Sequence, residues 1–135
     1  MTASLDTTVL IDVMNGRSER VRHLYSLGRA EGADWIISAI AYHEVLFGSA
    51  VRGKLDAERA LLHRLFEGCA VADFSSVHAQ EAAVIRTEMR LQGTPLEGYD
   101  LLIAAQARAE GWAVATGKLK HFNPVPGLVV EDWSG

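Results

Sequence analysis

Three carboxylate residues lie far apart in the sequence, each next to mostly apolar residues. Asp6 follows the first apolar segment, Glu44 lies inside a largely apolar stretch, and Asp100 directly precedes Leu101–Ala105. A carboxylate in such surroundings is costly to bury without a partner. Because Mg²⁺ and Mn²⁺ favour oxygen ligands, three acids that converge in the fold would suit a hard divalent cation.

Each acid also has a purely structural explanation. Asp6 could cap a helix, Asp100 could complement a helix dipole, and Glu44 could form an ion pair with an arginine such as Arg86. For any single acid the structural explanation is the stronger one, because caps and ion pairs are common uses of carboxylates. Taken together, the three acids favour a shared site.

The elements that would position these acids alternate between strand-length apolar runs and longer segments with helical spacing. This alternation predicts βαβ units, a mainly parallel sheet and a three-layer α/β fold. Parallel strands present their carboxyl ends to the ligand crevice, which is where Asp6 follows its strand. The predicted strands are 35–37, 70–72, 113–115 and 128–130, and the predicted helices are 19–32, 55–67, 77–92 and 100–110.

Length and composition are typical of one globular domain spanning residues 1–135. Hydrophobic residues make up 49% of the chain and charged residues 22%. The longest nearly apolar stretch, Leu101–Ala109, is far shorter than the roughly 20 residues that span a bilayer. The first residues lack a basic segment followed by an apolar run, so we expect no secretion signal and a cytoplasmic location.

The net charge of −4 argues against binding of nucleic acid by a broad basic surface. An RNA substrate would have to be attracted by bound metal and by local basic patches. Cys69 is the single cysteine, so neither an internal disulfide nor a zinc site built from several cysteines can form. The five histidines show no paired zinc-binding spacing.

Three segments carry a resemblance to a known family. The opening Leu5–Leu10 resembles the Asp-Thr-Asn/Ser-Val start of PIN domains, and Ser38–Ile40 leading to Glu44 and Gly48 is similar to their second acidic motif. The most specific match is the C-terminal half, which resembles that of VapC toxins from bacterial toxin–antitoxin pairs. Its matching residues are Gly93–Leu96, Asp100–Ala105, Ala115-Thr116, Phe122, Pro126–Leu128 and Trp133.

The resemblance spans essentially the whole chain and implies both an activity and a site. By similarity, Asp6, Glu44 and Asp100 are the metal-binding acids, while Thr8 and Thr116 help to position metal-bound water or phosphate. The implied activity is endonucleolytic hydrolysis of phosphodiester bonds in structured RNA such as tRNA or rRNA, with Mg²⁺ or Mn²⁺. The implied partners are a VapB-type antitoxin and a second copy of the chain in a homodimer.

One position departs from the family pattern. PIN domains usually carry Asp or Asn two residues after the threonine of the fourth motif, where this chain has Lys118. A protonated lysine cannot ligate a cation, so the fourth ligand is in question. Glu97 could compensate if the helix begins early, or it could be a solvated turn residue. His121 could contact phosphate or belong to an exposed basic loop.

Two other functions compete with the nuclease. A PIN domain that binds RNA or a protein with little or no cleavage is compatible with Lys118. A phospho-acceptor receiver domain also has acids at strand ends, but it needs paired acids after the first strand and usually a proline after the lysine. Here Asp6 stands alone and Leu119 follows Lys118, which makes the receiver domain the weaker alternative.

Overall fold

Five short strands form one sheet in the order β3-β2-β1-β4-β5, and all neighbouring strands are parallel. The computed structural model describes residues 1–135. The strands are β1 (Ala3–Leu5), β2 (Trp35–Ser38), β3 (Ala70–Ala72), β4 (Ala113–Thr116) and β5 (Val130–Asp132). The predicted parallel sheet is therefore confirmed.

The last strand lies later in the chain than its apolar residues predicted. The sequence indicated 128–130, whereas β5 begins at Val130. The backbone N–H of Leu128 donates to Val125 O at 3.3 Å, so Leu128 closes a turn after the proline-containing loop. Pairing with β4 starts only where Val129 O accepts from Val114 N at 2.9 Å.

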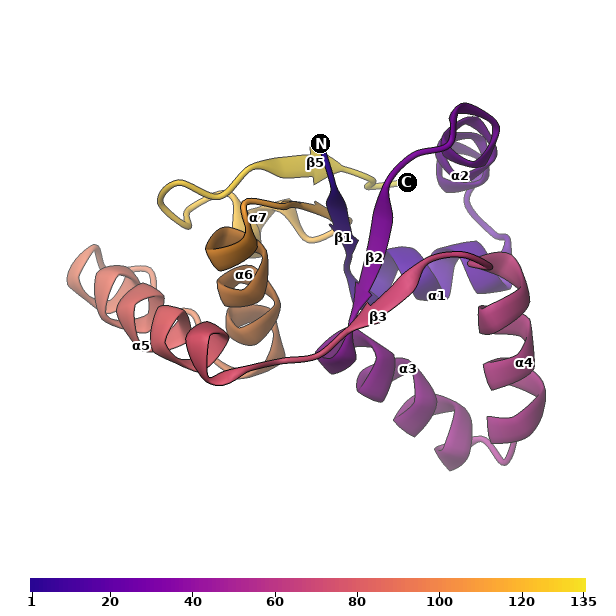
Figure 1. Ribbon diagram of the computed structural model, residues 1–135, viewed down its shortest axis with the longest axis horizontal. Coiled ribbons are helices and arrows are strands. Elements are labelled where there is room, and N and C mark those ends of the chain that lie inside the picture. The colour runs from indigo at the N-terminus through magenta and orange to yellow at the C-terminus, as the bar shows by residue number, and fades with distance from the viewer.

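Seven helices connect the strands and cover both faces of the sheet. They are α1 (Thr7–Asn15), α2 (Glu19–Glu31), α3 (Ala39–Val51), α4 (Leu55–Leu65), α5 (Ser76–Leu91), α6 (Gly98–Glu110) and α7 (Leu119–Phe122). Figure 1 shows α5 and α6 side by side on one side of the sheet and α1, α3 and α4 on the other. The arrangement is the predicted three-layer α/β/α fold.

Local signals account for the helix boundaries. Ser18 caps α2 by accepting the backbone N–H of Val21 at 3.2 Å. Gly111 ends α6 in the left-handed conformation at φ 75°, which a glycine adopts without strain. The same helix is the most buried one, as its apolar composition predicted, with Ile103 and Ala104 fully inaccessible.

The core lies between the sheet and these helices. Strands β1 and β4 are buried along their whole length, as expected for central strands covered on both faces. Gln106 of α6 is buried among apolar side chains, and its Nε2 donates to Ala72 O at 3.1 Å and Asp73 O at 3.0 Å. This polar link ties the end of β3 to α6.

The order of the strands determines where a site can form. After β1 the chain moves to β2 and β3 on one side, and it then crosses back to β4 and β5 on the other side. The direction of the connections therefore reverses between β1 and β4. In open parallel sheets, ligands bind at such a reversal, beyond the carboxyl ends of the two strands.

None of the helices has the length and apolar character that crossing a membrane would require.

Candidate active site

Asp6 lies at this reversal, immediately after β1, and is completely buried. Its backbone N–H donates to Ala115 O of β4 at 2.9 Å, which continues the β1–β4 pairing. Its Oδ1 accepts the backbone N–H of Thr7 at 2.6 Å and so caps α1. The capping explanation of Asp6 is correct, but it uses only one of the two carboxylate oxygens.

The second carboxylate oxygen of Asp6 receives two threonine hydroxyls. Oδ2 accepts from Thr116 Oγ1 at 2.7 Å and from Thr8 Oγ1 at 3.1 Å. Thr116 in turn accepts the backbone N–H of Lys118 at 2.9 Å, while Gly117 N–H donates to Thr8 Oγ1 at 3.2 Å. The structure thus gathers both hydroxyl residues named from the sequence around one acid.

Burial raises the pKa of Asp6 above its ordinary value. The hydrogen bond from Thr116 and the positive charge of Lys118 oppose this effect, whereas the negative charge of Asp100 adds to it. Asp6 forms no ion pair, so its charge is held by hydroxyls and one backbone N–H. A cation at this position would offset the cost of keeping the buried carboxylate ionised.

Glu44 approaches the same place from α3. It is half-buried, and its Oε1 accepts from Thr7 Oγ1 at 2.9 Å. Thr7 therefore contacts two candidate acids, Asp6 through its backbone and Glu44 through its side chain. Sequence reasoning missed Thr7, although a hydroxyl in the first helical turn after Asp6 was a usable signal. The proposed pairing of Glu44 with Arg86 is wrong.

Asp100 lies in the first turn of α6, with its side chain 14% exposed, and has two basic partners. Its Oδ2 accepts from His121 Nδ1 at 2.7 Å, and Lys118 Nζ lies 3.4 Å from its Oδ1. Lys118 and His121 follow β4, so the loop after this strand places two basic side chains on a candidate acid.

Glu97 points to other partners. It is exposed, and its Oε1 accepts from Arg86 Nη2 at 3.0 Å and from Arg90 Nη2 at 3.3 Å. These two ion pairs also explain why Arg86 is not paired with Glu44. Glu97 is therefore a surface residue at the start of α6 that offers no fourth acid next to Asp100.

The donor set suits a hard cation, although the side chains are not closed around one. Asp6, Glu44 and Asp100 come from three separate elements, and each offers carboxylate oxygens, the ligands that Mg²⁺ and Mn²⁺ prefer. No three acidic, histidine or cysteine side chains lie close enough together to hold a metal ion in this arrangement. Lys118 instead supplies a positive charge beside Asp100.

Comparison with known proteins agrees with this geometry. The family model described as PIN domain matches residues 3–118. The chain is 29% identical over 129 residues to the tRNA(fMet)-specific endonuclease VapC of Salmonella typhimurium, covering 96% of each chain. Among solved structures, VapBC2 from Rickettsia felis bound to a promoter DNA fragment superposes with a TM-score of 0.86 at 26% identity, covering 98% of this chain and 99% of the other. DNA-bound VapBC from Salmonella typhimurium superposes with a TM-score of 0.84 at 28% identity, covering 98% of each chain.

Proposed function

The chain belongs to the PIN domain family, and from this premise we propose that it is a metal-dependent endoribonuclease acting as the toxin of a toxin–antitoxin pair. One observation carries the proposal. The buried Asp6 at the β1–β4 reversal receives the hydroxyls of Thr8 and Thr116 on the oxygen that its helix cap leaves free. A fully buried carboxylate held in this way, with two further acids nearby, is suited to binding a cation.

Asp6, Glu44 and Asp100 would hold the metal ion, which when bound lowers the pKa of a coordinated water and offsets the charge on the phosphate. Thr116 and Thr8 keep the Asp6 carboxylate in one orientation by donating to its Oδ2. Thr7 does the same for Glu44. Fixed hydrogen bonds of this kind spare the acids a reorganisation when substrate arrives.

Lys118 and His121 present positive or hydrogen-bonding groups on the Asp100 side of the site. An RNA strand brings phosphates whose negative charge adds to that of the acids. Lys118 Nζ is placed to offset part of this charge, as fixed cations do in phosphoryl transfer. Within the proposal, Lys118 therefore binds substrate and replaces a metal ligand that other PIN domains carry.

The substrate class follows from the relatives. The Salmonella relative is named for cleavage of tRNA(fMet), so we infer that a structured RNA such as tRNA is the substrate here. The VapBC complexes among similar structures support a VapB-type antitoxin as partner. A homodimer is part of the same proposal and rests on the family resemblance alone.

The alternative is a PIN domain that binds RNA or protein without efficient cleavage. The ion pair between Lys118 and Asp100 favours this alternative, because it occupies a candidate metal ligand.

Cleavage assays on tRNA decide between the two. The purified chain should cut tRNA in Mg²⁺ or Mn²⁺ and stop on addition of a chelator. Asp6→Asn, Glu44→Gln and Asp100→Asn should each lower the rate by on the order of a hundredfold or more, because each removes a charged ligand. Asp56→Asn is the matched control, since the Asp56 side chain is 93% exposed on α4. Equal cleavage by all four variants contradicts the nuclease assignment.

Growth assays test the toxin role. Expression of the chain should arrest growth, and co-expression of the small protein encoded beside it should restore growth and yield a stable complex. The inactive Asp100→Asn variant should be harmless while still binding that partner. A neighbouring protein that neither binds nor restores growth contradicts the toxin role.

A further inference from the structure

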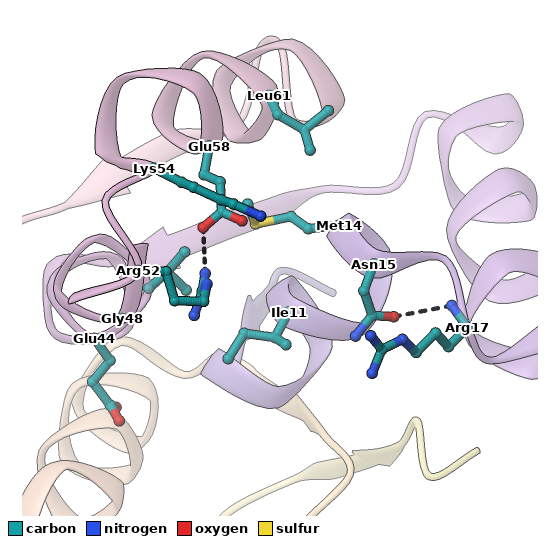
Figure 2. Close-up of a pocket in the computed structure, with 11 residues that line it drawn as sticks. Ile11, Met14, Asn15, Arg17, Glu44, Gly48, Arg52, Lys54, Glu58 and Leu61 are labelled. Atoms are coloured by element: carbon teal, nitrogen blue, oxygen red, sulfur yellow. Dashed lines mark hydrogen bonds and ion pairs between the residues drawn. The ribbon is translucent and has the colours of Figure 1, made fainter. Parts of the chain in front are cut away.

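A cavity of about 400 Å³ opens between α1, α3 and α4, next to the candidate active site. Figure 2 shows Glu44 at its edge, on the part of α3 that faces α1. Because Glu44 also accepts the Thr7 hydroxyl, this acid belongs to both the cavity and the site around Asp6. A molecule bound at the acids could extend into the cavity without a gap.

Three basic side chains line the cavity, and two of them are uncompensated. Arg52 forms an ion pair with Glu58, so its charge is already balanced. Arg17, in the loop after α1, and Lys54, just before α4, are exposed and form no ion pair with a carboxylate. In a protein of net charge −4, two free cations on one cavity form the kind of local basic patch that would attract phosphate.

The rest of the lining is apolar with one amide. Ile11, Met14 and Leu61 line the wall, and Ile11 is 45% exposed despite its apolar side chain. The Oδ1 of Asn15 accepts the backbone N–H of Arg17 at 2.9 Å, which leaves its amide N–H groups free to donate. Figure 2 shows Asn15 and Arg17 together at one side of the cavity.

These features match the parts of one nucleotide. A base offers an apolar face and polar edges, and the strand on either side of it offers phosphates. The cavity volume lies within the range of roughly 300–1,000 Å³ that is usual for sites that enclose a small ligand. A protein segment would need carboxylates to pair with the free cations, and it has no comparable reason to end at the metal-binding acids.

We propose that this cavity binds one unpaired nucleotide of the RNA substrate beside the cleaved phosphodiester, with Arg17 and Lys54 contacting its phosphates and Ile11 its base. The inference rests on the proposed nuclease function. It identifies the substrate as RNA that offers an unstacked nucleotide, such as a loop of tRNA. It also explains how an acidic protein holds RNA without a broad basic surface.

Binding of fluorescein-labelled tRNA, followed by anisotropy in a chelator so that no cleavage occurs, tests the proposal. The double variant Arg17→Glu/Lys54→Glu is compared with Arg59→Glu/Arg64→Glu, which makes the same charge change on α4 outside the cavity. The first variant should bind tRNA at least about tenfold more weakly than the second. Its plot of log affinity against log salt should lose a slope of about 0.7–0.9 for each phosphate contact.

A third variant separates base contact from general charge repulsion. Ile11→Ser should weaken tRNA binding while leaving the salt slope unchanged, because it removes an apolar contact and no charge. All three variants should retain the melting temperature of the parent within a few degrees, since the substituted side chains are exposed.

The outcomes separate this inference from the nuclease assignment. A parent protein that cuts tRNA, with the two double variants equally weakened or equally unaffected in binding, overturns the cavity proposal alone. The same conclusion holds if Arg17→Glu/Lys54→Glu keeps tRNA binding and loses only the neighbouring antitoxin, because the cavity would then be a protein-binding site. A parent that neither binds nor cuts tRNA overturns both.

Discussion

Replacing Lys118 with Met removes an ammonium group from the candidate metal site while keeping most of the side-chain stem. Lys118 Nζ lies 3.4 Å from Asp100 Oδ1. Two unit charges at that separation interact by about 5 kcal/mol at an effective dielectric constant of about 20. The Lys118 side chain is 36% exposed, so water, salt and side-chain freedom reduce the effect to about 1 kcal/mol.

A free-energy change of that size corresponds to about fivefold in metal affinity. Lys118→Met should therefore bind Mn²⁺ about fivefold more tightly than the parent in a calorimetric titration, because Asp100 no longer has a competing cation. Lys118→Asp should bind it more tightly still, since it adds an oxygen ligand. Lys120→Met, two residues along and exposed, is the control and should leave the affinity unchanged.

Cleavage rates of the same variants then show what Lys118 does. If it only fills a lost ligand position, both variants should cut tRNA at the parent rate or faster. If its ammonium stabilises phosphate charge, both should be slower despite their tighter metal binding. Unchanged metal affinity in both variants would refute the reasoning, because it would mean that the ion pair seen here does not persist when metal binds.

Two stability predictions follow from packing and charge away from the site. Gly28→Ala should destabilise the protein by about 1–2 kcal/mol in urea denaturation, because the added methyl group would overlap the Trp35 indole, whereas Gly48→Ala has room and should be neutral or stabilising by up to about 1 kcal/mol. Arg108→Met should cost about 1–2 kcal/mol at pH 7, because Arg108 Nη1 contacts Glu88 Oε2 at 3.0 Å. The guanidinium lowers the pKa of Glu88 below its ordinary 4.5, so the ion pair stabilises the fold above that pH, and the difference between parent and Arg108→Met should shrink as the pH falls through the lowered pKa. A loss that does not diminish in acid would show that Arg108 acts through packing or its bond to a backbone carbonyl.

Several features of the molecule were readable from local sequence. Helical spacing, with Ser18 before the second helix and Gly111 after the sixth, predicted most helices to within a few residues, because periodicity and capping depend on neighbours in the chain. The short apolar runs predicted the parallel strands for the same reason. The last strand was misplaced because a turn, closed by Leu128 and Val125, used residues with strand-like composition.

The candidate site was predictable only as a set of residue types. Motif resemblance named Asp6, Glu44 and Asp100, and the departure at Lys118 was visible in the letters alone. The partners of these acids were not visible. Arg86 seemed as good a partner for Glu44 as any, and nothing local showed that Thr7 would contact that acid instead.

Sequence by itself therefore determined which elements form and which side chains are available for chemistry, since both depend on short stretches of chain. Tertiary structure decided which of those side chains meet. Thr116 donates to Asp6 across 110 positions because β4 pairs with β1 in one register, which sets the ends of the two strands next to each other. The cavity beside Glu44 likewise exists only because α1, α3 and α4 pack on one face of the sheet and bring Arg17 and Lys54 to a common space. Such contacts depend on strand order, register and helix packing, which no local pattern of residues encodes.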